Sequence, residues 1–325
     1  MAGSSAFVAA LMTSPVAAVT ITYQVDPSAA AFAPTIAQAV STVQALYNNN
    51  VTVNMYFQAG SIGGGAESLT GFYHLPYATY TTQQTTNATN NPLNTTLATA
   101  VSNFGFGNNA LPTMSLSSAD LRAINPVANA FATPFLNVHG NLYDGVITLD
   151  TSLSGTTALN AALHEMDEVL GGGGGGSTLN HQGNSFFFDT YGATDLLRYS
   201  AAHTGSWTTD TSQTAYFSVD GGVHNLHFFN QAAAFGSDYG DFQTTPCVIQ
   251  SWQICSPTDS FVRGSLEDTM LEAIGYNPVA PTVPLPGTFA LFGGGLAAMG
   301  FFGWRSKRKA TAAIVPFHRS IQTPG

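Results

Sequence analysis

The chain has 325 residues, of which 44% are hydrophobic and only 8% are charged. This length allows one large domain or two modest ones, and so few charges are more typical of a secreted protein than of a cytosolic enzyme. All 18 acidic residues but only three of the eight basic ones precede residue 283, which gives this part a net charge of −15. Such an acidic body repels phosphate backbones, which excludes nucleic acid as an expected partner, and it attracts divalent cations.

The first residues have the composition of a targeting segment. Residues 1–18 are mostly apolar and small, and Val16 and Ala18 suit the positions before a cleavage site. A basic n-region is missing, as it would be if the true start of the chain lay further upstream; the alternative is a first buried strand. We expect a signal peptide at 1–18 and a folded domain at 19–278.

The domain begins with the pattern of an α/β (α+β) fold. In residues 19–24 and 51–57, apolar and polar side chains alternate, as they do in strands. In residues 34–47 between them, the apolar residues recur at the spacing of a helix. This strand–helix–strand order predicts a mixed, twisted sheet. Residues 79–94 are rich in Thr, Asn and Gln, and we expect them to form a long surface loop.

An apolar helix predicted at 155–170 carries the most informative motif. It follows a predicted strand at 146–149, which we expect at the edge of the sheet. In the helix, His164 and Glu168 are four residues apart and so project from one face, and Glu165 follows the histidine directly. Burial of an imidazole among acidic side chains is costly without a partner, and a bound divalent cation removes that cost.

This pattern matches the His-Glu-x-x-His motif of zinc peptidases at its first two positions, with Glu168 in place of the second histidine. We predict that His164 and Glu168 bind Zn²⁺ and that Glu165 is the catalytic base, which takes a proton from the attacking water. A second carboxylate ligand would lower the Lewis acidity of the zinc relative to a histidine-rich site. The alternative is an ordinary amphipathic helix with a solvated acidic face.

The third zinc ligand must lie further along the chain, because residues 171–176 are all glycine. The candidates are Asp195, His181, Asp189 and His203. We favour Asp195, which begins a predicted short helix and whose alternative role is to cap that helix, and we place His181 second. Tyr199 is a candidate for stabilising the oxyanion of the reaction, and a buried structural tyrosine is the alternative.

Two further groups of residues are candidates for cross-linking or for metal binding. Cys247 and Cys255 are the only cysteines, and in an exported protein we expect them to form a local disulfide rather than two free buried thiols. Asp220, Asp238 and Asp241 are candidate Ca²⁺ ligands, but no regular ligand spacing supports such a site and we favour turn roles for them.

Five segments of the domain occur together in an order that carries a family resemblance. They are 164–171, 194–200, 216–222, 238–242 and 270–276. Together they resemble a family of bacterial secreted proteins classed by inference as metalloproteases, whose members carry His-Glu-x-x-Glu and often a PEP-CTERM tail. The resemblance implies a zincin-like metallopeptidase fold over residues 19–278 with an active-site helix, and it supports the metal site more strongly than the reaction.

The end of the chain has three parts in a characteristic order. A linker at 279–287 contains Pro-Leu-Pro, an apolar run at 288–304 is just long enough for a transmembrane helix, and a basic tail at 305–325 predicts a cytoplasmic end. These parts resemble the PEP-CTERM sorting signal of Gram-negative bacteria, with Leu285 where the signal has glutamate. The resemblance implies recognition by an exosortase-type enzyme, a transient or stable stay in the inner membrane, and placement at the cell surface or in extracellular matrix.

The leading functional hypothesis is therefore an exported zinc-dependent endopeptidase that acts on protein or peptide substrates. The rival is a non-catalytic matrix or adhesion protein that keeps a zincin scaffold. A glycan hydrolase that uses Glu165 and Glu168 as paired acids ranks last, because two carboxylates so close on one helix do not straddle a sugar bond well.

Overall fold

The computed structural model describes residues 18–104, 113–173, 176–179, 189–207, 212–231, 238–255 and 260–280. Residues 1–17 of the expected signal peptide, His181 and everything from residue 281 onward lie outside these ranges. The predicted membrane helix at 288–304 is therefore not described. Within the described ranges, no helix combines the length and the apolar character needed to span a bilayer.

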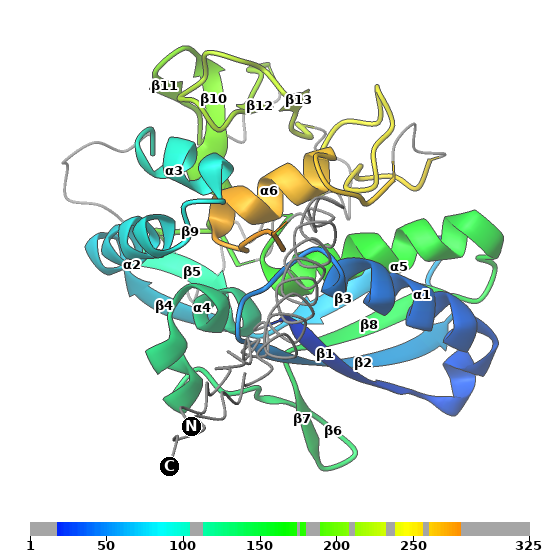
Figure 1. Ribbon diagram of the computed structural model, residues 1–325. Helices are drawn as coiled ribbons and strands as arrows, with labels where there is room; N and C mark the ends of the chain where they lie inside the picture. Colours follow the sequence, from blue (N-terminus) through cyan, green and yellow to red (C-terminus); the bar gives the residue numbers. More distant parts are fainter. Residues whose placement is uncertain are drawn as a thin grey trace, which may run out of the picture. The chain divides into compact units, whose positions relative to one another are not determined.

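A four-stranded mixed sheet in the order β1-β2-β8-β3 carries the N-terminal half of the fold (Figure 1). Its members are β1 (Thr20–Val25), β2 (Thr52–Gly60), β3 (Ala66–Thr70) and β8 (Gly145–Asp150). The first three in sheet order are parallel, and β3 runs antiparallel to β8. The mixed α/β class expected from the sequence is thus confirmed.

The expected edge position of the strand at 146–149 is wrong. This strand is β8, which pairs on both sides and is buried at five of its six positions, whereas β3 forms the edge. A strand that is buried between two neighbouring strands shows a continuous apolar run in the sequence. In an edge strand that is half exposed, apolar and polar residues alternate. β3 follows the glycine-containing loop at 61–65, and its mixed composition gave no strong strand pattern.

Two helices pack side by side on one face of this sheet, as Figure 1 shows. Helix α1 (Ala33–Gln44) buries Ile36, Val40 and Val43, which recur at helical spacing. Helix α5 (Gly155–Leu170) has the bounds expected from the sequence and ends at Gly171, whose φ of 102° is left-handed. Together with the sheet, these helices enclose much of the apolar core.

Close packing between α5 and β8 leads to a prediction on stability. A Cβ added to Gly145 would lie 2.2 Å from a methyl group of Val169 on α5, whereas one added to Gly60 would meet nothing closer than 3.7 Å. We expect Gly145→Ala to lower the free energy of unfolding by about 1–3 kcal/mol through overpacking. Gly60→Ala, in the same sheet, should change it by less than about 0.5 kcal/mol. Equal urea midpoints for the two variants would contradict this packing.

The remaining strands form two smaller sheets and a hairpin. One sheet has the order β4-β5-β9, the other β11-β10-β12-β13, and β6 pairs with β7. Their bounds are β4 (Phe72–Pro76), β5 (Thr113–Ser117), β6 (Leu136–Val138), β7 (Asn141–Tyr143), β9 (Thr190–Tyr191), β10 (Arg198–Ala201), β11 (Thr204–Gly205), β12 (Tyr216–Phe217) and β13 (His227–Phe228). The other helices are α2 (Tyr77–Asn90), α3 (Thr95–Val101), α4 (Ser118–Ile124) and α6 (Leu266–Ile274).

Helix α2 replaces most of the long loop expected at 79–94. Its threonine hydroxyls donate hydrogen bonds to backbone carbonyls four residues earlier, as Thr82 does to Ala78, which satisfies these polar side chains within the helix. Gln84 and Asn87 are buried and donate to the carbonyl oxygens of Ile274 and Gly275 at the end of α6. Tertiary contacts therefore outweigh the low helix propensity of the segment.

A buried ion pair joins α4 to the start of β8. Arg122 lies 2.8 Å from Asp144, and the two side chains are 5% and 0% exposed. Asp144 also accepts hydrogen bonds from the backbone N–H of Asn54 and from the hydroxyl of Ser118. These contacts tie three separate segments of the chain together in the core.

Candidate metal centre

Helix α5 brings three of the predicted site residues together. His164 Nε2 and Glu168 Oε1 lie 3.5 Å apart across one helical turn. With Glu165, they form a group whose ligand atoms all lie within 4.8 Å of one another. Glu165 is only 4% exposed, so this group sits inside the protein rather than on a solvated helix face.

A fourth side chain, Asp241, approaches the same histidine from a distant part of the sequence. Its Oδ1 lies 3.7 Å from His164 Nε2, and the residue is 4% exposed. Gln250, which is fully buried, donates a 2.9 Å hydrogen bond to Asp241 Oδ1, and its amide nitrogen lies 3.4 Å from His164 Nε2. Asp241 and Gln250 are the residues of the site that sequence reasoning did not assign to it.

The separations around His164 Nε2 match those of ligands that share a cation. They are 3.5 Å to Glu168 and 3.7 Å to Asp241, longer than an ordinary hydrogen bond. Two ligands about 2.1 Å from one tetrahedral zinc ion are roughly 3.4 Å apart. One imidazole and two carboxylates are also donors that zinc accepts in proteins, so the residues present fit this metal. The group within 4.8 Å takes its carboxylates from Glu165 and Glu168; Asp241 is outside that group but lies 3.7 Å from His164 Nε2.

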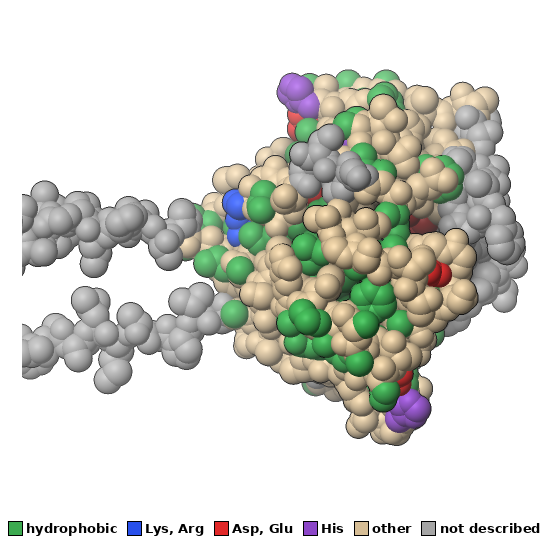
Figure 2. All heavy atoms as spheres, turned by 90° about the vertical axis from the view of Figure 1, so that its right-hand side faces the viewer, with side chains coloured by type: hydrophobic (Ala, Val, Ile, Leu, Met, Phe, Trp, Pro, Cys, Tyr) green, Lys and Arg blue, Asp and Glu red, His purple; other side chains and the backbone are tan. Residues whose placement is uncertain are grey.

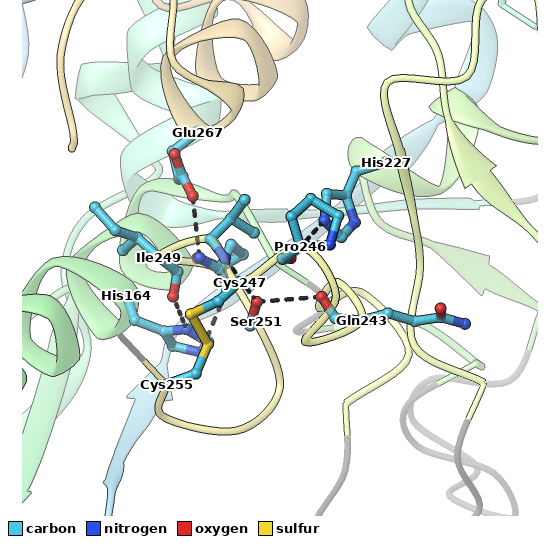
Figure 3. Close-up of a disulfide and its surroundings, with 11 residues drawn as sticks. His164, His227, Gln243, Pro246, Cys247, Ile249, Ser251, Cys255 and Glu267 are labelled. Atoms are coloured by element: carbon cyan, nitrogen blue, oxygen red, sulfur yellow. Dashed lines mark hydrogen bonds between the residues drawn. A yellow bond between two sulfur atoms is a disulfide. The ribbon is translucent and has the colours of Figure 1, made fainter. Parts of the chain in front are cut away.

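The imidazole of His164 is held by its other nitrogen. Nδ1 lies 2.9 Å from the carbonyl oxygen of Ile249, a distance at which it donates a hydrogen bond (Figure 3). With a proton on Nδ1, Nε2 is the ring nitrogen that faces Glu168 and Asp241, and it is able to bind a metal once it has given up its own proton.

Glu168 is oriented by the edge strand of the sheet. Ser68 on β3 donates a 2.6 Å hydrogen bond to Glu168 Oε2, which leaves Oε1 directed at His164. The site is therefore built from β3, α5 and the segment that contains Asp241 and Gln250.

Burial and mutual repulsion set the protonation of the site. Burial raises the pKa of Glu165 well above its usual value, and the neighbouring Glu168 raises it further. Burial alone would also raise the pKa of Glu168, but hydrogen bonds from His164 and Ser68 outweigh it and the pKa is lowered. Burial opposes a charge on His164, yet Asp241 and the two glutamates outweigh it, so that the pKa of His164 is raised well above its usual value. The site thus attracts positive charge.

A cleft of about 610 Å³ opens beside these residues. His164, Glu165 and Asn160 of α5 line one side of it, the start of β3 and the preceding glycines line another, and Val248, Ile249 and residues 251–255 line a third. Figure 2 shows a face of the molecule with few charged side chains, on which uncharged polar groups and backbone predominate. Glu165 is thereby placed where a ligand in the cleft can reach it.

The glycine run after α5 lies against the acidic residues of that helix. A Cβ at Gly172 would lie 2.6 Å from the carboxylate of Asp167, and one at Gly173 would lie 2.7 Å from Gln250 Nε2 and 2.9 Å from Glu168 Cγ. No side chain fits at these positions. The glycines that close the helix therefore also allow the chain to pass next to the metal centre.

The other predicted site residues lie elsewhere. Asp195 is buried and its carboxylate accepts a hydrogen bond from the backbone N–H of Gly192, so it closes a turn and is not part of the His164 group. Tyr199 is 1% exposed and its hydroxyl donates to the carbonyl oxygen of Asn103, which is the structural role weighed against an oxyanion role. Asp189 and His203, further candidates for the third ligand, are likewise not in that group, and His181 lies outside the described residues.

A disulfide joins Cys247 to Cys255 close to His164, as Figure 3 shows. No free cysteine is present in the described part of the chain. The loop that it closes contains Ile249 and Gln250, both of which contact His164.

Comparison with known protein families finds the PEP-CTERM protein-sorting motif at residues 282–309. No curated protein and no solved structure matches the chain. The sorting motif confirms the signal expected at the C-terminus: this is an exported, surface-directed bacterial protein that an exosortase-type enzyme recognises. The match covers the tail and not the metal centre.

Proposed function

We propose that this protein is a surface-directed zinc-dependent endopeptidase with a zincin-like active site. His164, Glu168 and Asp241 would hold the metal, and Glu165 would be the general base. The observation that supports this most directly is the spacing around His164 Nε2, with carboxylate oxygens at 3.5 and 3.7 Å in a buried site. These distances fit shared coordination better than direct hydrogen bonding.

In this proposal, the chemistry is divided between the metal and Glu165. Bound zinc polarises the scissile carbonyl group and acidifies a water molecule. Glu165 takes a proton from the attacking water and passes it to the leaving amine, a task for which burial has already raised its affinity for protons. The acidic neighbours of His164 hold the ring in place while Ile249 fixes its tautomer.

The cleft suits a peptide in extended conformation. The edge of β3 away from β8 has no partner strand among the described residues, and the start of β3 lines the cleft. An extended peptide can add to such an edge through backbone hydrogen bonds. A scissile bond placed along this edge would lie beside Glu165, which lines the same cleft.

Zinc content and proteolysis of the purified exported protein test this proposal. We expect about one equivalent of zinc, cleavage of casein, and loss of cleavage on treatment with a chelator that is reversed by added Zn²⁺. Less than about one-tenth of an equivalent, after incubation with zinc, would favour a non-catalytic matrix or adhesion protein. Full zinc occupancy without cleavage of any protein substrate would leave a metal-binding protein and refute the peptidase.

The assignment of the third ligand leads to a prediction of its own. Asp241→Asn should weaken zinc binding by at least about 100-fold, because a charged oxygen donor is lost from the centre. Asp195→Asn removes a buried carboxylate of the same kind that contacts Gly192 instead, and should leave zinc affinity within about twofold of wild type. Competition with a chromophoric chelator measures both. The reverse ranking would restore Asp195 as the ligand.

A further inference from the structure

The loop closed by the disulfide carries two of the contacts that fix His164. The carbonyl oxygen of Ile249 accepts from Nδ1 at 2.9 Å (Figure 3). The side-chain amide nitrogen of Gln250 lies 3.4 Å from Nε2. Both residues stand between Cys247 and Cys255, which are eight positions apart in the sequence. The covalent bond therefore brackets the part of the loop that touches the proposed metal ligands.

Gln250 links that loop to the rest of the site. Its side chain donates to Asp241 Oδ1 at 2.9 Å, and its backbone N–H donates to Glu267 Oε1 on α6 at 3.1 Å. It is 0% exposed, and its side-chain oxygen has no hydrogen-bond partner among the described residues. A buried amide in this position holds one carboxylate of the site, and the same nitrogen lies 3.4 Å from His164 Nε2.

Regular secondary structure does not hold this segment. Between residues 238 and 255 the described chain forms only isolated bridges, from Phe242 to Phe229 and to Ser251. Further hydrogen bonds within the segment run from Phe242 N–H to Gln250 and from Trp252 N–H to Phe242, at 2.8 and 3.0 Å. A covalent cross-link removes conformational freedom that a segment without helix or strand retains in spite of its hydrogen bonds.

The geometry points to the Cys247–Cys255 disulfide as a positioning element of the metal centre, which binds Zn²⁺ with full affinity only in the oxidised protein. This inference rests on the zinc site of the proposed function. The disulfide acts through Ile249 and Gln250, which orient His164 and Asp241. Because the chain is exported, the site would be completed after the protein leaves the reducing cytoplasm.

The redox step is ordinary thiol–disulfide exchange. The two cysteine thiols give two electrons and two protons to the disulfide of an envelope oxidant, an S–S bond forms between Cys247 and Cys255, and the oxidant leaves as a dithiol. Reduced thiols are themselves zinc ligands, so chemical reduction alone would confuse the measurement. Serine substitution removes both the bond and the thiolate donors.

The test measures zinc affinity in the full exported protein, by competition with a chromophoric chelator. We expect the double variant Cys247→Ser/Cys255→Ser to bind Zn²⁺ about 10- to 100-fold more weakly than wild type, the range typical for loss of groups that orient metal ligands. Circular dichroism checks that this variant is folded. Equal affinity in a folded variant would overturn the inference while leaving the zinc site itself intact.

A pair of glutamines on the same loop gives a matched comparison that keeps the disulfide. Gln250 is buried against Asp241, whereas Gln253 is exposed. Gln250→Ala should weaken zinc binding by about 10-fold or more, and Gln253→Ala should leave it within about twofold. Unchanged affinity in Gln250→Ala overturns the inference even if the double serine variant does not fold.

These outcomes distinguish the positioning role of the disulfide from the proposed peptidase activity. Wild-type protein that binds zinc but cleaves no protein, with weaker binding in Gln250→Ala and in the serine variant, refutes the reaction and supports the positioning role. Wild-type protein that binds no zinc refutes both.

Discussion

Glu165→Gln should reduce peptide hydrolysis by at least about 100-fold and leave the zinc content of the protein unchanged. The side chain lines the cleft beside His164 but is not needed as a metal ligand when His164, Glu168 and Asp241 supply the donors. General base catalysis contributes typically 10²–10⁴-fold, and glutamine keeps the size of the side chain while it cannot accept the proton. The measurement is kcat/KM on a fluorogenic peptide together with metal analysis.

The comparison variant for this experiment is Glu168→Gln. It lies one turn further along α5, and its Oε1 faces His164 at 3.5 Å. We expect this change to lower zinc affinity as well as hydrolysis, since a negatively charged donor is lost. If Glu165→Gln cleaves peptides as fast as wild type, the proposed mechanism is wrong. If the two variants lose zinc equally, Glu165 is a ligand rather than the base.

Asp144→Asn should lower the free energy of unfolding by about 3–5 kcal/mol, the usual result of removing one partner of a buried ion pair. Asp144 is 0% exposed and lies 2.8 Å from Arg122, whose charge would remain in the core without compensation. The free energy of unfolding of a native protein is about 5–15 kcal/mol, so this loss is a large fraction of it. It corresponds to a fall in Tm of roughly 10 °C.

An exposed pair provides the control for this measurement. His224, which pairs with Asp220, is 77% exposed, so solvent screens their interaction. Asp220→Asn should therefore cost less than about 1 kcal/mol. Thermal and urea unfolding at neutral pH measure both variants. A loss below about 1 kcal/mol in Asp144→Asn would show that the Arg122 charge is accommodated by the carbonyl oxygens of Ala132 and Thr52, which it also contacts.

The effect of Glu165→Gln on hydrolysis and the effect of Asp144→Asn on stability concern parts of the protein that are connected through the four-stranded sheet. The ion pair fixes the start of β8, and β8 pairs with β3, whose Ser68 orients Glu168. The Asp144 side chain itself bonds to Arg122, Asn54 and Ser118, none of which is a residue of the site, so we expect its loss to lower zinc binding only through loss of folded protein. Zinc titration of the folded fraction of Asp144→Asn distinguishes this from a direct effect on the site.

Local sequence patterns were sufficient to predict the elements that satisfy their own backbone hydrogen bonds and bury one face. Helix α5 has the bounds that periodicity and its terminal glycine predict. His164, Glu165 and Glu168 converge for the same reason, because a helical repeat places residues four apart on one face whatever the rest of the chain does. The sorting signal is also a property of linear sequence, and the family comparison finds it at 282–309.

Tertiary structure decided the features that depend on partners distant in the chain. Helix α2 forms because Gln84 and Asn87 find carbonyl groups at the end of α6, and β3 becomes the edge strand because it pairs with β8. Asp241, and not Asp195, lies beside His164, and it accepts a hydrogen bond from Gln250 on the disulfide-closed loop. Spacing along a sequence determines contacts only within one helix or strand. Contacts between segments depend on how the whole core packs. The contact between His164 and Asp241, the proposed third donor, is a contact between segments.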